Sequence, residues 1–310
     1  MELYNILHKK TSVQVWAPPG AVPNAEIASK VPVRRIYPRL FRFPKNGTVV
    51  LAGSGPWWIG KWIKFWKPKR VILICQLPNI RQTLKRINEL EKVYGLERYL
   101  EIVYAARWIR DAVGRPGRVL ISPIDIERFR PCAASLQRNK DDFTVGRMSR
   151  DIYYKHHPDD KKLYSLLAEL GIKVRIMGGE CLGLEKHPNI EVIREGEEAP
   201  EEFLKSLDVF FYRTDTRFWV EPHGRVVTEA LASGLPVVCG NQGGFTEWVV
   251  PDQNGYITSG NPEVVDAIKK LRTESSAYKR LAKGARTTAE DAFSIARIDE
   301  MVWYLARGKV

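Results

Sequence analysis

Two glutamates flank the predicted start of a helix. Glu221 precedes Pro222 and Gly224, which break regular structure, so its carboxylate belongs to a loop. Glu229 lies about one and a half turns inside the helix that follows. The backbone amides around Gly224–Val226 and the positive end of the helix dipole suit a diphosphate group. The two carboxylates can then accept hydrogen bonds from sugar and ribose hydroxyls, so this stretch predicts a nucleotide-sugar site.

Alternating strands and helices must position this site. In the second half the sequence predicts a strand beginning at 143, then strands at 173–178, 190–193, 209–212 and 236–239, with helices at 159–170, 200–207 and 225–233. In the first half it predicts strands at 12–16, 48–53, 70–75 and 99–105, with helices at 57–67 and 80–94. This alternation is typical of parallel sheets that bind ligands at the carboxyl ends of their strands. We therefore expect two doubly wound, Rossmann-like α/β domains that face each other across a cleft.

The domain boundaries follow from length and composition. A chain of 310 residues is expected to form two domains at roughly 150 residues each. Residues 131–142 are polar and poorly periodic, so we predict an N-terminal acceptor-side domain at 1–131 and a C-terminal donor-binding domain at 143–292. Ser294 is a suitable N-cap for a final amphipathic helix within 293–310, which could pack back on the first domain.

Cysteine spacing and hydropathy bear on compartment and metal binding. The four cysteines lie far apart, without disulfide or zinc spacing: Cys75, Cys132, Cys181 and Cys239. We therefore expect a reducing, cytoplasmic compartment. His156 and His157 have no acidic partner at ligand spacing, so no metal site is predicted. No apolar run approaches the roughly 18 residues of a spanning helix, so neither an exported nor an integral membrane protein is expected.

Basic residues are concentrated in the first half. Residues 1–140 hold 26 Lys and Arg against 9 Asp and Glu, whereas the remaining residues hold 23 against 27. The first half should therefore attract an anionic partner such as lipid headgroups, nucleic acid or a phosphorylated substrate. No zinc-finger, helix-turn-helix or RNP-type signature accompanies the charge, so nucleic acid is not the expected partner.

Four motifs follow one another within residues 115–275. They are SPIDIERFRP (122–131), VGRMS (145–149) with Lys155 downstream, EPHGRVVTEALASGLPVV (221–238), and GGFTE (243–247) with Gly255. In this order they resemble the retaining, nucleotide-sugar-dependent glycosyltransferases of family 4 (glycosyl transferases group 1), which have the GT-B fold. Residues 1–110 are similar to that family only in their rhythm of strands and helices.

The resemblance implies a role for each motif residue. Arg147 and Lys155 would neutralise the donor diphosphate, on which charge builds as the glycosidic bond breaks. Glu221 would contact the donor sugar and complete the catalytic set, and Glu229 would bind the nucleotide ribose. The other expected donor-site residues surround the helix start or lie in glycine-containing turns: His223, Gly224, Arg225, Val226, Gly243, Gly244 and Gly20. No cofactor or metal is expected; a nucleotide sugar and a sugar-containing acceptor are the substrates.

Residues 57–70 form a basic, tryptophan-rich stretch, with four of the nine tryptophans and five basic residues. On a helical wheel, Trp58 belongs to an apolar face opposite Lys61 and Lys64, and Trp57 falls on the lysine side. Such a helix either buries one face on its own sheet or contacts an anionic membrane or lipid-linked acceptor. Trp57, Trp58, Lys61 and Lys64 are therefore candidate membrane or acceptor contacts, which would place the protein peripherally on the inner face of the membrane.

Three functions remain open from the sequence. The first is retaining transfer of a sugar from a nucleoside-diphosphate sugar to the hydroxyl of a glycan, lipid-linked or phosphorylated acceptor. The second is a catalytically silent sugar-nucleotide-binding subunit that acts with a partner; Gln76-Leu77-Pro78 favours it, because many members of the family place a histidine there. The third is a sugar-nucleotide epimerase on the same fold, which would need acid and base groups that the sequence does not identify.

Overall fold

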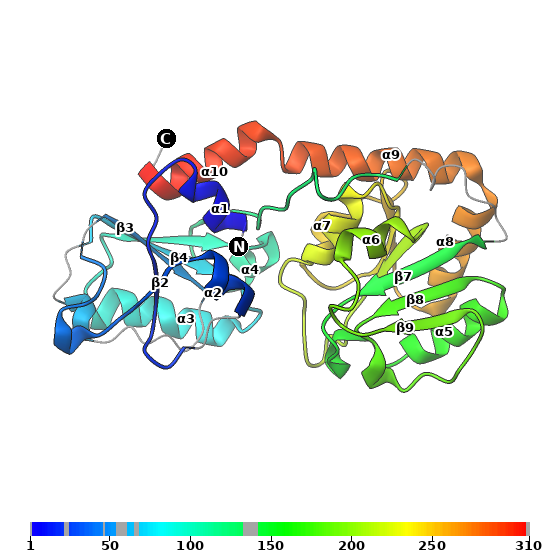
Figure 1. Cartoon of the computed structure of the whole chain (residues 1–310), viewed down its shortest axis with the longest axis horizontal. Helices are drawn as coiled ribbons and strands as arrows, with labels where there is room; N and C mark the ends of the chain where they lie inside the picture. The colour runs from blue at the N-terminus through cyan, green and yellow to red at the C-terminus, as the bar shows by residue number, and fades with distance from the viewer. Residues whose placement is uncertain are drawn as a thin grey trace. The chain divides into compact units, whose positions relative to one another are not determined.

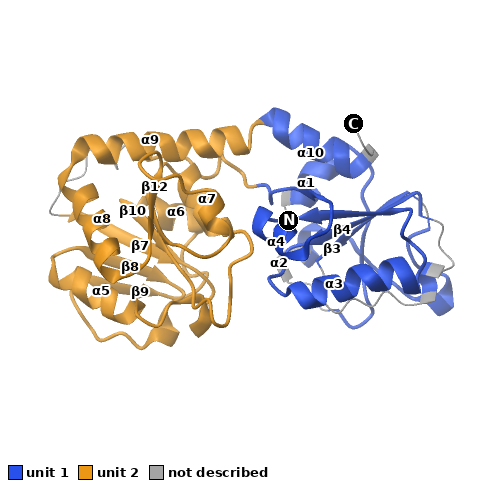
Figure 2. Ribbon diagram, turned by 180° about the vertical axis from the view of Figure 1, so that it is seen from behind, with its two compact units in different colours: residues 1–123, 295–310 blue, residues 124–294 orange. Residues whose placement is uncertain are grey.

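The chain divides into two compact units in the computed structural model, which describes residues 2–21, 25–45, 47–53, 61–64, 68–132 and 142–307. The first unit comprises residues 1–123 and 295–310, and the second comprises residues 124–294 (Figure 2). Residues 124–132 belong to the second unit because Phe129 is buried there and Arg286 donates hydrogen bonds of 3.0 Å to the carbonyls of Ile126 and Phe129. The division therefore comes earlier than the polar stretch 131–142.

A four-stranded parallel sheet forms the middle of the first unit (Figure 1). Its strands are, in order, β3 (Thr48–Ala52), β4 (Arg70–Cys75), β5 (Leu100–Tyr104) and β6 (Arg118–Val119). A separate parallel pair consists of β1 (Val15–Ala17) and β2 (Val33–Arg35). The helices of this unit are α1 (Glu2–His8), α2 (Ala25–Lys30), α3 (Ile80–Asn88), α4 (Arg107–Val113) and α10 (Ile295–Arg307).

Strand β4 is buried on both faces because helices cover both sides of the sheet. Val71 and Leu73 point to one face, where they pack with residues of α3 and α4. Ile72 points to the other face, in a cluster with Met301 and Leu305 of α10. Figure 1 shows α10 and α1 on one side of this sheet and α3 on the other. A strand buried on both faces reads as a continuous apolar run, which explains the sequence of β4.

The tryptophan-rich stretch is only partly described. A 3-10 turn spans Lys61–Lys64, and within it Trp62 and Ile63 are buried in the core of the first unit. Trp57 and Trp58 lie outside the described residues, as do the side chains of Lys61 and Lys64. The described part of the stretch therefore packs against its own sheet, and its proposed membrane face remains a prediction.

The second unit contains a six-stranded sheet in which every pair is parallel. The strand order is β9 (Ile190–Ile193), β8 (Lys173–Met177), β7 (Thr144–Met148), β10 (Val209–Tyr212), β11 (Val237–Gly240) and β12 (Gly255–Thr258). Numbered along the chain, this is the order 3-2-1-4-5-6 of a Rossmann sheet. The direction of winding reverses between β7 and β10, so the sheet has its switch point there.

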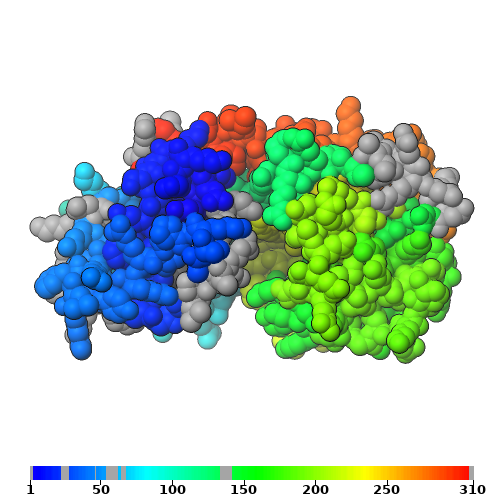
Figure 3. Space-filling model, in the orientation of Figure 1, coloured from blue at the N-terminus to red at the C-terminus, as the bar shows by residue number. Residues whose placement is uncertain are grey.

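Five helices complete the second unit: α5 (Asp160–Glu169), α6 (Pro200–Lys205), α7 (Arg225–Ala232), α8 (Asn261–Thr273) and α9 (Ser275–Ala292). The bounds of α5, α6, α7 and the first five strands confirm the elements predicted between 143 and 239, whereas β12, α8 and α9 were not predicted. Arg128 pairs with Glu201 of α6 at 2.7 Å, and Figure 3 shows the segment around 128 (green) beside α6 (yellow-green) on one face of the unit. Within the described part of the chain, no helix is both long and apolar enough to cross a membrane.

Candidate functional site

The predicted motif residues of the second unit gather where its sheet reverses direction. Arg147 lies near the end of β7, and Lys155 lies in the loop that follows this strand. Glu221 lies in the segment between β10 and α7, and Glu229 lies within α7. Because β7 and β10 are parallel neighbours, the segments after them leave the same edge of the sheet. Ligands of doubly wound sheets bind at this position.

Arg147 is entirely buried in this structure, and its contact with a donor phosphate stays a prediction. Its Nη1 lies 3.0 Å from Oδ2 of Asp160, and neither side chain has exposed surface. Its Nη2 donates to the backbone carbonyl of Lys155 at 2.6 Å. The second oxygen of Asp160 accepts a 2.6 Å bond from Arg213, so one carboxylate neutralises two guanidinium groups. In this structure Arg147 holds the loop that carries Lys155 and does not line an open site.

Lys155 and Glu221 form the polar centre of the site. The Lys155 Nζ lies 2.6 Å from Oε2 of Glu221 and 4.5 Å from the centre of the Trp219 ring. The same Oε2 accepts hydrogen bonds from the Tyr212 hydroxyl at 3.1 Å and from the Trp219 indole at 3.2 Å. Three donors therefore fix the position of one carboxylate oxygen. Among the described residues the second oxygen, Oε1, has no hydrogen-bond donor, so it can accept one from a ligand.

Burial changes the charge properties of this centre. The side chains of Lys155 and Glu221 are 8% and 14% exposed. Desolvation lowers the pKa of Lys155, and the charge of the Glu221 carboxylate opposes that change. Burial also raises the pKa of Tyr212, so its phenol stays protonated and donates to Glu221. The Lys155–Glu221 ion pair is thus buried beside Tyr212 and Trp219, where solvent screens its electrostatic field only weakly.

Helix α7 begins beside this centre without a side-chain cap. Its N-cap is Gly224, which has a φ of 78°. Glu229 is 6% exposed and accepts a 2.8 Å bond from Arg225, one turn earlier on the same helix. Arg225 and Val226 are both half-buried at the first turn. The predicted arrangement of a loop carboxylate, a helix start and a helix carboxylate is therefore confirmed in its geometry.

Two glycines allow the segment 243–247 to approach the loop before α7. A Cβ atom on Gly244 would lie 2.0 Å from the carbonyl oxygen of Pro222, and one on Gly224 would lie 2.5 Å from the Cβ of Phe245. The Gly244 amide donates to the Glu221 carbonyl at 2.7 Å. Both glycines thus serve backbone geometry that fixes Glu221.

Two other predicted residues, His223 and Gly20, are not part of the polar centre that Lys155 and Glu221 form: His223 packs on Trp248, and Gly20 belongs to the first unit. The imidazole of His223 is buried and lies edge-on to the Trp248 ring, with ring centres 5.3 Å apart. Gly20 lies in an exposed turn of the first unit, where a Cβ atom would meet no described atom within 4 Å. The structure therefore gives His223 a packing contact and gives Gly20 no close neighbour among the described residues.

Sequence reasoning missed four residues of this site: Asp160, Tyr212, Arg213 and Trp219. Asp160 had a detectable signal, since an acid in the first turn of a predicted helix often pairs with a nearby cation. Trp219 stands two residues before Glu221, so its position beside the motif was also visible. Tyr212 ends the buried strand β10 and Arg213 follows it, and only the strand order brings them against Arg147.

His156 illustrates a second contact that sequence spacing did not predict. The fold places its imidazole near Asp151 and Cys181, with one potential ligand atom of each residue within 4.8 Å of the others. Burial is the main cause that lowers the pKa of His156, to about 3, so the ring is neutral at ordinary pH. The prediction of no metal site rested on spacing along the chain, which did not show that His156 lies beside Asp151 and Cys181.

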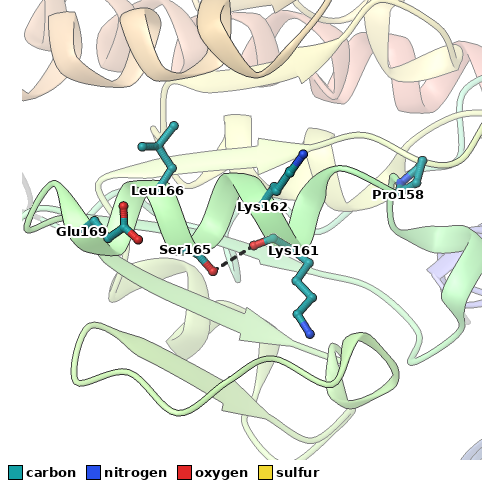
Figure 4. Close-up of a pocket in the computed structure, with 6 residues that line it drawn as sticks. All are labelled: Pro158, Lys161, Lys162, Ser165, Leu166 and Glu169. Atoms are coloured by element: carbon teal, nitrogen blue, oxygen red, sulfur yellow. Dashed lines mark hydrogen bonds between the residues drawn. The ribbon is translucent and has the colours of Figure 1, made fainter.

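A hollow on the outer face of α5 is separate from these residues. It is lined by Pro158, Lys161, Lys162, Ser165, Leu166 and Glu169. Figure 4 shows the side chains of Lys161 and Lys162 pointing away from each other, and Ser165 bonded to the Lys161 carbonyl. Because its polar groups diverge and none of the predicted site residues lines it, we assign it no binding role.

A family model and two curated proteins match parts of the chain. A family model described as "Glycosyl transferases group 1" matches residues 132–288. Spore coat protein SA of Bacillus subtilis (strain 168) is 39% identical over 85 residues, which is 26% of this chain and 22% of that protein. Capsular polysaccharide biosynthesis glycosyltransferase CapM of Staphylococcus aureus is 23% identical over 177 residues, which is 53% of this chain and 44% of that protein. The matches thus span less than half the length of each curated relative.

Solved structures share the fold at low sequence identity. Alr3699/HepE of Anabaena, in complex with UDP-glucose, has a TM-score of 0.59 at 18% sequence identity. The match covers 75% of this chain and 71% of the Alr3699/HepE chain. Sucrose-phosphate synthase from Thermosynechococcus elongatus has a TM-score of 0.66 at 16% identity, covering 84% and 73%. WaaG, a glycosyltransferase involved in lipopolysaccharide biosynthesis, has a TM-score of 0.61 at 13% identity, covering 98% and 94%. With its two parallel α/β units, the chain therefore has the GT-B fold.

Proposed function

This chain belongs to the glycosyl transferases group 1 family, and on that premise we propose that it transfers a sugar from a nucleoside-diphosphate sugar to a hydroxyl group of an acceptor, with retention of the anomeric configuration. The observation that carries the proposal is the Glu221 carboxylate, held by Lys155, Tyr212 and Trp219 beside the uncapped start of α7. A fixed carboxylate next to a helix N-terminus suits a ligand that joins a sugar to a diphosphate.

The donor diphosphate is proposed to lie at the start of α7. The first-turn amides and the helix dipole favour an anion there, and Arg225 adds a guanidinium whose side chain is 40% exposed. Arg150, exposed in the loop after β7, supplies a second cation on that loop. We assign Arg225 and Arg150, rather than Arg147, as cationic partners of the donor diphosphate. Arg147 has no exposed surface, so it could contact a phosphate only if the loop after β7 rearranged.

The sugar and ribose are proposed to contact the two carboxylates. Oε1 of Glu221 would accept a hydrogen bond from a sugar hydroxyl, while Lys155 and the aromatic donors hold the group in place. Glu229 accepts a bond from Arg225 beside the start of α7, and its carboxylate is proposed to accept another from a ribose hydroxyl.

In the proposed reaction, the bond between the anomeric carbon and the diphosphate oxygen breaks, and the electron pair leaves with the diphosphate. The acceptor oxygen forms the new bond on the same face, and its proton passes to the departing phosphate oxygen. Cations and amides around α7 stabilise the charge that develops on the leaving group, which is the role that the family resemblance assigns to protein groups rather than to a metal.

The acceptor side of the proposal rests on charge. Because the basic excess lies in residues 1–140, the favoured acceptor is a phosphorylated or lipid-linked glycan, and the protein would work at an anionic membrane surface. Flotation with anionic vesicles at low salt tests the membrane part of this proposal. Absence of binding to vesicles that contain anionic lipid would refute it without affecting the donor site.

A thermal-shift screen tests donor binding before the acceptor is known. The wild type, Glu229→Ala and Glu169→Gln are heated with UDP-, GDP-, ADP- and dTDP-sugars, since a ligand that binds only the folded state raises the Tm. Glu169, exposed on the outer face of α5, is the matched control. We expect one nucleotide class to raise the Tm of the wild type and of Glu169→Gln, and this shift to be lost in Glu229→Ala.

Two further measurements separate the alternatives. Once the donor is known, proton NMR of the first product formed from it reports its anomeric configuration, and inversion would contradict the retaining mechanism. A donor that binds but is neither transferred nor hydrolysed, with any acceptor or added partner protein, would support the silent subunit. A well-folded chain whose Tm no donor raises would contradict the proposed donor site itself.

A further inference from the structure

Three side chains with metal-binding atoms meet beside the donor-site loop, outside the Lys155–Glu221 pair. Asp151 and His156 lie in the loop after β7, and Cys181 lies in the turn after β8. A carboxylate oxygen, an imidazole nitrogen and the cysteine sulfur all lie within 4.8 Å of one another. Neighbouring ligand atoms around a tetrahedral zinc ion are roughly 3.3–3.8 Å apart, given bonds of about 2.0–2.3 Å, so small side-chain movements would complete the geometry.

The imidazole of His156 is oriented as a ligand requires. The side chain is 2% exposed, and its Nε2 lies 2.9 Å from the carbonyl oxygen of Gly178. A carbonyl only accepts, so Nε2 carries the proton and Nδ1 presents its lone pair. Among the described residues this buried Nδ1 has no hydrogen-bond partner. A backbone carbonyl behind the other ring nitrogen is the usual way in which a metal-binding histidine is held.

The two other ligands are held by the backbone. Oδ1 of Asp151 accepts a 2.9 Å bond from the Cys181 amide, which ties the two loops together. The Asp151 amide donates to Oε2 of Glu195 at 2.9 Å. Gly178 has a φ of +76°, and a Cβ there would lie 2.0 Å from the Ser149 carbonyl oxygen, so only glycine lets the turn after β8 come this close.

We propose that Asp151, His156 and Cys181 form a zinc site with three protein ligands and one open position. Sulfur, nitrogen and oxygen donors together suit zinc, whereas magnesium and calcium prefer oxygen alone. Asp151 is half-buried and Cys181 is exposed, so the fourth position faces solvent and takes water. Binding converts the Cys181 thiol to a metal-bound thiolate and releases its proton to solvent.

The surroundings tolerate this cation. The guanidinium of Arg147, near the end of β7, already has its counter-ion, since Asp160 lies 3.0 Å away, and Arg150 on the loop itself is exposed to solvent. The carboxylates of Glu180 and Glu195 flank the two loops and add negative charge. The site is separate from the proposed transfer chemistry. Because His156 adjoins Lys155, a bound ion would fix the loop that carries Lys155 to the turn after β8.

Titration of the intact chain with zinc alone tests the site. After removal of metals with EDTA, we expect one zinc ion per chain to bind, measured by competition with a chromophoric chelator. Cobalt in place of zinc should give a near-ultraviolet thiolate-to-cobalt absorption band. Cys181→Ser should abolish the band and weaken zinc binding by more than the roughly 10–100-fold that loss of an outer-shell partner causes. Cys132→Ser, which removes another cysteine that is not fully buried, should change neither.

The Tm of each variant shows whether a loss of zinc binding comes from loss of the fold. Cys181 is exposed, so the serine variant should fold, and its Tm without metal should match that of the wild type. Added zinc should raise the Tm of the wild type and of Cys132→Ser but not that of Cys181→Ser. The proposal is overturned if no stoichiometric zinc binds, or if Cys181→Ser binds zinc as the wild type does. A signal that disappears in Cys132→Ser would likewise assign the metal to another place.

Discussion

The two units use charged residues differently. In the second unit, Arg147 and Asp160 form an ion pair with no exposed surface, and Lys155 and Glu221 pair at 8% and 14% exposure. In the first unit, a pair such as Lys92 and Glu97 is 69% and 65% exposed. Buried charges are part of the core and of the site, so their removal affects folding and binding. Exposed charges are screened and contribute mainly a long-range attraction for anions.

The first unit also has partly buried ion pairs, and one of them lies at the helix that covers its sheet. Arg70 binds Glu101 through two bonds of 2.6 and 2.7 Å, and the Tyr304 hydroxyl donates to the same carboxylate at 2.7 Å. The guanidinium groups of Arg70 and Arg118 lie 4.5 and 4.6 Å from the centre of the Tyr304 ring. This cluster joins α10 to β4, β5 and β6. Buried charge here holds the last helix of the unit against its sheet.

The largest expected effect is that of Arg147→Met on stability. Removing this guanidinium leaves Asp160 buried with only Arg213 as its cationic partner among the described residues. Breaking a buried ion pair typically costs about 3–5 kcal/mol, and we expect the lower end of that range because Arg213 remains. Urea unfolding measures the change, with Arg150→Met as the exposed control. Unchanged stability together with lost donor binding would instead make Arg147 a phosphate ligand, and the contrast between the units would weaken.

The next largest effect is that of Glu221→Gln on activity. The amide cannot pair with Lys155 as a charge, and it no longer offers three donors an anionic acceptor. Loss of one such electrostatic contact typically lowers kcat by about 10²–10³-fold, and we expect about 100-fold in kcat/KM. Release of nucleotide from the identified donor is the readout. Glu97→Gln in the first unit is the control, and an equal loss in both variants would contradict the proposed site.

Tyr304→Phe tests the partly buried cluster of Arg70, Glu101 and Tyr304 through its pH dependence. Burial, with help from Glu101, raises the pKa of Tyr304 to about 12. A phenol with a raised pKa contributes stability below its ordinary pKa of about 10 and loses it as pH rises to about 12. The unfolding free energy of the wild type should therefore fall more steeply in that window than that of Tyr304→Phe. Tyr99→Phe, at an exposed position, should keep the wild-type slope.

The smallest effect is expected for Glu97→Gln on stability. The pair that it breaks joins two exposed side chains across 3.4 Å, a type of interaction worth about 0–1 kcal/mol. The unfolding free energy should change by less than about 0.5 kcal/mol, and the difference should vanish in high salt. A change as large as that of Arg147→Met would show that the exposed pairs of the first unit are structural after all.

Much of the second unit could be predicted from the sequence. The strands and helices predicted between 143 and 239 occur where hydrophobic periodicity placed them, and Glu221 and Glu229 flank the start of α7 as expected. Strand β12 and helices α8 and α9 were not predicted. The first unit was harder to predict. Its first strand is Val15–Ala17 rather than 12–16, and the helix predicted over 80–94 is an α-helix only to Asn88 and continues as a π-helix over Glu89–Val93. Local patterns indicate that a helix exists more reliably than they indicate where it ends.

The sequence by itself determined the alternation of strands and helices, the loop and helix positions of the two carboxylates, and the excess of basic residues in the first half. These properties depend on residues that are close in the chain. Tertiary structure alone decided that Arg147 is buried against Asp160, that Trp219 and Tyr212 hold Glu221, and that His156 meets Asp151 and Cys181. The strand order creates these contacts, and no local spacing encodes which parallel strands become neighbours.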